Sequence, residues 1–132
     1  MSPVEPQSYP PADAVLLCED NDHVRMLIER ILIDAGYEVL SSAHPRDALE
    51  LGSLHADRIA LVVTDVILPG MSGLEFVGRV RGELASVPTL FLSGYSAKAV
   101  SDFGDLPGNS EFLQKPFDQE ALLAKVAALR GD

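Results

Sequence analysis

The sequence is short of features that whole classes of protein require. Its 132 residues include a single cysteine, Cys18, and 10 Lys+Arg against 20 Asp+Glu give a formal net charge of −10. One cysteine permits no internal disulfide, which favours a reducing compartment and a small buried thiol. The scarcity of basic residues argues against sequence-independent binding of DNA or RNA and against a polybasic membrane contact.

Long apolar runs are also missing. No stretch approaches the ~20 residues that span a bilayer. The N-terminus lacks the basic start and apolar centre of a signal peptide, and its prolines without periodicity predict an extended or disordered tail over 1–13. We therefore expect a cytoplasmic protein, with one domain over 14–130 because hydrophobic residues make up 47% of the chain.

Two kinds of segment alternate along that domain. Continuous apolar runs predict strands buried on both faces, as in a parallel sheet, over 15–18, 37–40, 59–63, 87–92 and 112–113. Apolar residues at helical spacing predict helices over 24–35 and 45–52, after a capping box of Ser72 and Glu75, and after the cap Asp118. The alternation predicts an α/β fold with an open, doubly wound sheet.

The segment 97–109 gives the weakest helical signal. Gly104, Pro107 and Gly108 leave room for about two turns of helix at most. We expect a short or mobile fourth helix there.

Polar residues that do not fit the core pattern recur where the predicted strands end. Glu19 and Asp20 follow the first strand, Asp65 the third, Ser93 the fourth and Lys115 the fifth. Open parallel sheets bind ligands at this edge. In a strand order of 2-1-3-4-5, the first and third strands would be neighbours and would bring the three carboxylates together.

Three carboxylates in one cleft repel one another unless a cation lies among them. Compact acidic oxygen sites suit Mg²⁺, which prefers one or two carboxylates together with a phosphate. An oxygen of Asp65 can then attack a phosphoryl group, while Lys115 and Ser93 supply a positive charge and a hydroxyl donor to its oxygens. The pattern indicates phosphoryl transfer onto a carboxylate.

Four stretches carry a family resemblance, and they read LLCEDND, LVVTDVILPGMSGLEF, TLFLSGYS and EFLQKPF. In this order and spacing they resemble the response-regulator receiver family, over about residues 14–129. The resemblance implies a flavodoxin-like receiver fold, with a five-stranded parallel sheet in the order 2-1-3-4-5. It also implies a two-component phosphorelay domain that requires Mg²⁺.

The resemblance assigns roles to the acidic residues. Asp65 matches the phospho-acceptor and Asp20 the acid that binds the metal directly. Glu19, where an Asp is more common, matches a neighbour that reaches the metal through water. The backbone carbonyl of Ile67 matches the third protein ligand.

Other matched positions bind or sense the phosphoryl group. Ser93 matches the switch hydroxyl, Lys115 the phosphoryl-binding lysine, and Phe112 the aromatic residue that turns inward on phosphorylation. Lys115-Pro116 resembles the family's cis peptide. Ile67 cannot orient a hydrolytic water and the bulky Tyr95 could shield the phosphate, so slow spontaneous dephosphorylation is expected.

The resemblance also implies partners. A histidine kinase or a histidine phosphotransfer protein would donate the phosphoryl group. The face of the fourth helix, fifth strand and fifth helix would then act on a downstream protein, whose identity the sequence leaves open. We expect no output domain after Asp132, and hence either a free-standing receiver, slightly favoured by Met1, or one excised from a hybrid kinase.

Three rival functions remain to be weighed. A haloacid-dehalogenase-like phosphatase would carry a second Asp where Ile67 stands, so turnover of external substrates is not expected. A flavodoxin-like cofactor binder would need a phosphate-cradling loop in place of 19–22, where three of the four residues are acidic. A degenerate receiver that only binds partners would lack chemical groups that are all present here.

Overall fold

The computed structural model describes residues 14–83 and 87–131. The tail predicted over 1–13 lies outside these described residues.

One five-stranded parallel sheet forms the centre of the fold. Its strands are β1 (Ala14–Cys18), β2 (Glu38–Ser42), β3 (Ile59–Asp65), β6 (Thr89–Ser93) and β7 (Ser110–Gln114). They lie in the order β2-β1-β3-β6-β7, and every neighbouring pair is parallel. Counted along the chain, this is the order 2-1-3-4-5, so the predicted sheet is confirmed.

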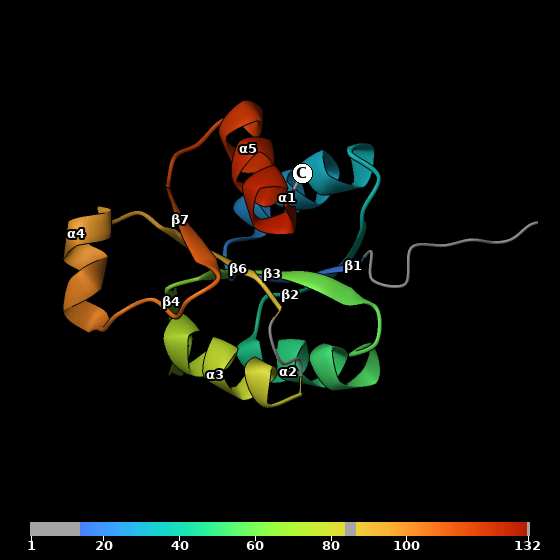
Figure 1. Cartoon of the computed structure of the whole chain (residues 1–132), viewed down its shortest axis with the longest axis horizontal. Coiled ribbons are helices and arrows are strands. Elements are labelled where there is room, and N and C mark those ends of the chain that lie inside the picture. The colour runs from blue at the N-terminus through green and yellow to red at the C-terminus, as the bar shows by residue number, and fades with distance from the viewer. Residues whose placement is uncertain (1–13, 84–86, 132) are drawn as a thin grey trace, which may run out of the picture.

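Helices cover both faces of this sheet. These are α1 (Asp22–Asp34), α2 (Pro45–Leu54), α3 (Gly73–Glu83) and α5 (Gln119–Arg130). Figure 1 shows α1 and α5 on one face and α2 and α3 on the other. The predicted caps are present, because Ser72 Oγ accepts a hydrogen bond from Glu75 N at 3.0 Å and Asp118 Oδ1 one from Ala121 N at 2.8 Å.

Alternating side chains of the central strands build two separate cores. Leu16, Val62 and Phe91 belong to the cluster under α2 and α3, whereas Leu17 and Leu90 belong to the cluster under α1 and α5. All five side chains are buried. Neither face of the central strands meets water, and this accounts for the unbroken apolar runs in the sequence.

The short fourth helix is confirmed. The helix α4 spans only Ala97–Val100 and continues as a single 3₁₀ turn, Ser101–Phe103. Ser96 caps α4 by accepting a hydrogen bond from Ala99 N at 3.1 Å, and Val100 anchors it in the core. Figure 1 shows α4 set to one side of the layers formed by the other helices.

One predicted strand bound needs correction, and one pair of strands was not predicted. The fourth predicted strand starts at Thr89 instead of residue 87, since Pro88 has no N–H to give to the ladder. An antiparallel pair between β3 and α3 was not predicted. It joins β4 (Ile67–Leu68) to β5 (Met71–Ser72) around a turn with Gly70 at φ 75°.

Fewer apolar side chains of α1 are buried than the spacing of apolar residues over 24–35 predicted. Ile28, Ile31 and Leu32 are buried, but Leu27 is 50% exposed. Leu27 lies about 100° around the helix from Ile28, which turns it away from the sheet. Met26 and Ile33 of the same helix are also more than half exposed.

Candidate functional site

The carboxyl ends of the strands meet at one edge of the sheet, as expected. Hydrogen bonds between neighbouring strand ends fix this edge: Glu19 N donates to Ser42 O at 3.1 Å, and Lys115 N donates to Ser93 O at 2.8 Å. Asp65 is the last residue of β3. The topology therefore places the predicted site residues around the end of β3.

Three carboxylates form the acidic cluster of the site. One oxygen from each of Glu19, Asp20 and Asp65 lies within 4.8 Å of the others. Glu19 and Asp65 are buried, whereas Asp20 is exposed. Among residues 14–83 and 87–131, this is the group whose composition and spacing could hold a metal ion.

Lys115 bridges two of these acids. Its Nζ lies 2.7 Å from Glu19 Oε1 and 2.7 Å from Asp65 Oδ1. The peptide between Lys115 and Pro116 is cis, as the resemblance implied. The other carboxylate oxygen of Asp65, Oδ2, is buried and receives no hydrogen bond from the described residues.

The environment shifts the protonation of this pair. Burial, followed by the neighbouring Glu19, raises the pKa of Asp65 to about 8, while Lys115 acts in the opposite direction. Burial lowers the pKa of Lys115, but its contacts with Asp65 and Glu19 outweigh burial and leave that pKa above its ordinary value. The site therefore favours a positive charge next to Asp65 and disfavours an uncompensated carboxylate there.

Glu19 and Asp20 have different surroundings although they are adjacent. Glu19 Oε2 accepts a hydrogen bond from Asn21 N at 3.0 Å, and its other oxygen faces Lys115. Asp20 has no hydrogen bond or ion pair with any of the described residues. Both oxygens of Asp20 are therefore available to a ligand.

A pocket of about 280 Å³ opens beside the acidic cluster. It is lined by Asp20, Asp65, Ile67, Leu92, Ser93, Gly94, Tyr95 and Lys115. All the predicted site residues line it except Glu19, which is buried beneath, and Phe112. Ile67 is 48% exposed and Tyr95 57% exposed, so both of these bulky lining side chains remain accessible to solvent.

Ser93 and Phe112 occupy defined positions near this pocket. Ser93 is buried, and its Oγ accepts a hydrogen bond from Tyr95 N at 3.0 Å. Phe112 is partly buried against the core cluster that contains Val100 of α4. Phe112 therefore packs against the same core cluster as Val100 of α4, and it does not line the pocket.

Cys18 ends β1 directly below the acidic residues and is fully buried. Burial, followed by Asp65, raises the pKa of its thiol to about 12. The thiol is protonated at neutral pH, which suits the packing role expected from the sequence.

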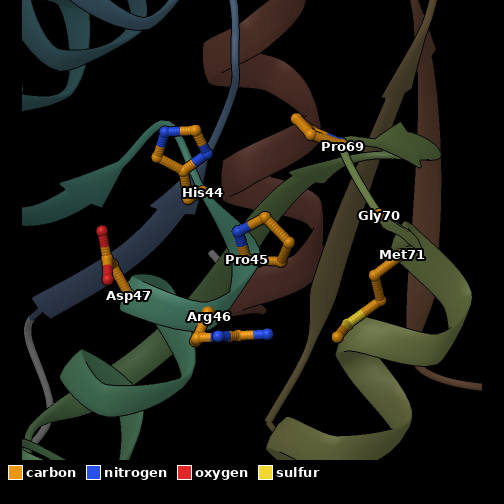
Figure 2. A pocket seen from close by; sticks show the side chains of 7 residues that line it. All are labelled: His44, Pro45, Arg46, Asp47, Pro69, Gly70 and Met71. Carbon is orange, nitrogen blue, oxygen red and sulfur yellow. The ribbon is translucent and has the colours of Figure 1, made fainter.

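A separate hollow of about 330 Å³ lies between the start of α2 and the β4–β5 turn. Figure 2 shows its lining, with His44, Pro45, Arg46 and Asp47 on one side and Pro69, Gly70 and Met71 on the other. It shares no lining residue with the acidic pocket. The chemistry belongs to the smaller pocket, where carboxylates, a lysine and a hydroxyl converge.

Comparison with known proteins agrees with this geometry. The sequence signature described as the response regulator receiver domain matches residues 15–127. The chain belongs to the response regulator receiver family. It is a phospho-accepting receiver domain of two-component signalling.

Similar proteins include whole regulators and isolated receivers. The chain is 37% identical over 114 residues to the uncharacterized transcriptional regulatory protein YrkP of Bacillus subtilis, covering 86% of this chain and 48% of that protein. The Brucella abortus receiver protein CpdR is 29% identical over 112 residues, covering 85% of this chain and 92% of CpdR. The chain thus spans about half the length of YrkP and of the Salmonella typhimurium regulator TctD.

Solved structures give the same result. The receiver domain of the hybrid histidine kinase CckA superposes with a TM-score of 0.75 at 34% identity, covering 89% of this chain and 98% of that one. The Vibrio cholerae chemotaxis protein CheY4 gives 0.77 at 31% identity with the same coverage. Receiver domains of this family bind Mg²⁺ at an acidic pocket, and they interact with histidine kinases or phosphotransfer proteins.

No helix in residues 14–83 and 87–131 is long and apolar enough to cross a bilayer.

Sequence reasoning missed the residues that hold the loop between β1 and α1. Asn21 Oδ1 caps α1 by accepting a hydrogen bond from Val24 N at 3.0 Å. Arg25 donates to the backbone carbonyl of Glu19. An Asn directly before a helical pattern is a sequence signal for such a cap, but no sequence pattern indicated the contact of Arg25.

Proposed function

We propose that Asp65 is the phospho-acceptor of this receiver, and that Mg²⁺ binds between Asp65 and Asp20. The main support for this proposal is the buried oxygen Oδ2 of Asp65. It borders a solvent-accessible pocket and receives no donor from the described residues, which is costly unless a cation or an electrophile occupies the adjacent space.

The donor set fits a hard cation. Asp20 offers two unengaged oxygens, Asp65 offers Oδ2, and Ile67, whose carbonyl the family resemblance assigns as the third ligand, lines the same pocket. Glu19 is less suited to direct binding, because Asn21 N and Lys115 already hold its two oxygens. When bound, Mg²⁺ would neutralise the carboxylates and the incoming phosphoryl oxygens.

Phosphoryl transfer is then a displacement at phosphorus. An oxygen of Asp65 forms the new P–O bond while the P–N bond to the donor's histidine breaks, and the leaving imidazole takes up a proton. The ammonium of Lys115 lies 2.7 Å from Asp65 Oδ1, so it is close enough to form an ion pair with the phosphoryl oxygens once they are attached to Asp65. The hydroxyl of Ser93 lines the same pocket and can donate to a phosphoryl oxygen after releasing Tyr95 N.

The donor would dock over the exposed face of α1. This helix starts directly after the acidic residues, and its Met26, Leu27 and Ile33 are half exposed or more. Exposed apolar side chains next to a reactive pocket are typical of a protein contact. A histidine kinase or histidine phosphotransfer protein covering them would bring its phosphohistidine to Asp65.

The output would pass through α4, β7 and α5. A move of Ser93 toward the phosphate would alter the turn that leads into α4, since Tyr95 N would lose its acceptor. Phe112 on β7 packs against the same cluster as Val100 of α4. A rotation of the Phe112 ring would therefore change the packing that holds α4. The helix α4 is only four residues long and is held in the core by a single buried side chain, Val100, which suits a switchable element whose two states phosphorylation biases.

Phosphorylation of the purified protein tests the acceptor. Treatment with a small acyl phosphate donor and Mg²⁺ should add one phosphoryl group to the intact mass of the wild type and none to Asp65→Asn. EDTA should abolish the gain in the wild type. A gain of the same size in Asp65→Asn would overturn the assignment of Asp65.

The lifetime of the phosphate should depend on Ile67. Its side chain lies at the pocket rim and has no group that could orient a water molecule. Ile67→Asn should therefore shorten the acyl-phosphate lifetime severalfold, and Tyr95→Ala should shorten it by opening the rim. The decay is followed by intact mass after removal of the donor, and a lifetime of seconds unchanged in Ile67→Asn would contradict the idea.

We also propose that the chain turns over no external substrate. Hydrolysis of a phosphate ester through an aspartyl intermediate needs a general acid close to the nucleophile, and the hydrocarbon side chain of Ile67 stands where such an acid would act. A chromogenic phosphate monoester should release no product above the rate of Asp65→Asn. Multiple turnovers by the wild type alone would contradict this.

A further inference from the structure

Hydrogen bonds within the loop that joins β1 to α1 leave a single acid unengaged. Glu19 Oε2 accepts from Asn21 N and Asn21 Oδ1 accepts from Val24 N, each at 3.0 Å. Asp22 Oδ1 is taken by Arg25. Asp20 is the remaining acid of the loop, and it faces the pocket.

Arg25 joins the two ends of this loop. Its Nη1 donates to the backbone carbonyl of Glu19 at 3.0 Å, and its Nη2 donates to Asp22 Oδ1 at 2.7 Å. Asp20 lies between these two anchor points in the chain. The Arg25 side chain is only 18% exposed, so its contact with the Glu19 carbonyl is partly buried, whereas the Asp22 side chain of the ion pair is 75% exposed and adds little.

The contact with Glu19 also satisfies a backbone group that the sheet leaves without a partner. The pairing of β1 with β2 and β3 ends at Cys18, one residue before this carbonyl. A carbonyl beyond the end of the ladder needs another donor or water. A planar guanidinium can reach this carbonyl and the Asp22 carboxylate with different nitrogens, whereas a lysine ammonium is a single point donor.

We propose that Arg25 is a positioning residue for the metal site, fixing the β1–α1 loop so that Asp20 faces Asp65 before Mg²⁺ arrives. The inference rests on the proposed function, because it concerns the same metal ion. Arg25 does not touch the phosphoryl group. Its loss should weaken metal binding without removing any group that reacts.

The expected size follows from other metal sites. Replacing a residue that orients metal ligands typically lowers the metal affinity about 10- to 100-fold. For Arg25→Gln we expect a loss of about tenfold in Mg²⁺ affinity. Arg25→Lys keeps the charge and one donor, so it should recover part of that loss.

Arg79 provides a matched control. It also forms an ion pair within one helix, with Glu75 at 2.8 Å, but both side chains are more than half exposed and the pair lies on α3. Arg79→Gln removes the same charge from the chain as Arg25→Gln. A difference between the two variants therefore reports the position of Arg25, and not the net charge.

Two measurements on the 132-residue chain test the proposal. In the first, Mg²⁺ is titrated into ¹⁵N-labelled protein, and the amide shifts of residues around the pocket give the affinity. In the second, the rate of phosphorylation by a small acyl phosphate is measured against Mg²⁺ concentration. Arg25→Gln should raise the half-saturating Mg²⁺ about tenfold in both, keep the rate at saturating Mg²⁺ within about twofold, and leave Arg79→Gln at wild-type values.

Several outcomes would overturn the proposal. One is an equal shift for Arg25→Gln and Arg79→Gln, which would leave only a charge effect. Another is a fall in the saturated rate at unchanged half-saturation. A third is an Arg25→Lys variant that loses as much Mg²⁺ affinity as Arg25→Gln and also has a lowered urea midpoint, because this would indicate general destabilisation of the fold. If the wild type binds Mg²⁺ but is never phosphorylated, the proposed function fails, and the NMR titration still decides the role of Arg25.

Discussion

At the scale of single residues, the site is organised around one buried acid. Asp65 is 4% exposed and lies against Glu19. The single positive charge of the Lys115 ammonium compensates only part of the negative charge of these two carboxylates. Burying an ionised carboxylate without full compensation is unfavourable, and this cost raises the pKa of Asp65 to about 8. The same unfavourable charge makes the site receptive to a cation.

This acid should make the stability of the metal-free protein depend on pH. Its pKa is raised from 3.8 to about 8, so between these values the folded chain holds a proton that the unfolded chain has released. Raising the pH through this interval therefore lowers the free energy of unfolding. Urea denaturation in EDTA should show the wild type losing stability from pH 5.5 to 8.5, with a shallower loss in Asp65→Asn.

Excess Mg²⁺ is the control for this pH series. It should flatten the wild-type slope by binding the ionised acid, and it should have little effect on Asp65→Asn. Parallel slopes for the two proteins in EDTA would show that ionisation of Asp65 does not control stability over this range.

At the scale of elements, the connection from β3 to α3 is tight because Gly73 has no side chain. A Cβ at Gly73 would lie 2.0 Å from the carbonyl oxygen of Asp65, and Gly73 N donates to Val66 O. The neighbouring atoms are backbone, so they cannot rotate away. The start of α3 and the backbone of the acceptor therefore depend on each other.

Gly73→Ala should damage both stability and the site. Because the clash is with backbone, we expect a loss of about 1–3 kcal/mol in the free energy of unfolding and a marked fall in phosphorylation of Asp65. Gly78 is the matched control, since it lies on the same helix, is exposed, and has nothing within 4 Å of the added Cβ.

Gly78→Ala should raise stability by about 0.5–1 kcal/mol through helix propensity and leave phosphorylation unchanged. Urea denaturation and intact mass after donor treatment measure the two effects. Equal stabilities of the two variants would show that the backbone at Gly73 can move without cost.

At the scale of the whole molecule, the sheet divides the interior into two cores that share its strands. Phe76 is buried under α3 in one cluster, and Leu122 of α5 is buried in the other. Since each central strand contributes side chains to both clusters, neither core can come apart while the strands stay paired.

Removing either anchor should therefore weaken one cooperative unit. Phe76→Ala should cost about 3–5 kcal/mol and Leu122→Ala about 2–5 kcal/mol, each with a single unfolding transition. Leu54→Ala, at a side chain 75% exposed, should change stability by less than about 0.5 kcal/mol. Circular dichroism and tyrosine fluorescence should give the same midpoint, and separate transitions for the two core variants would show that the faces unfold independently.

Much of this molecule follows from the sequence alone. Short unbroken apolar runs are typical of strands covered on both faces, so they predicted the parallel sheet and, with it, the edge at which Asp65, Ser93 and Lys115 meet. Ser72, Asp118 and the stop before Gly36 placed helix ends, because capping is a local interaction. The scarcity of basic residues and the lack of long apolar runs led us to expect no nucleic-acid contact and no membrane span. For the described residues, no helix is long and apolar enough to cross a bilayer, and the expectation about nucleic acid stays a prediction.

The tertiary structure decided what depends on direction and distance. The unequal surroundings of Glu19 and Asp20, the contact of Arg25 with Glu19 O, and the exposure of Leu27 all depend on how α1 lies against the sheet. The β4–β5 pair escaped notice because two-residue strands carry no periodicity. Local patterns determine which elements form and which residues stand at their ends, whereas the partner of each buried charge is set only when distant segments pack together.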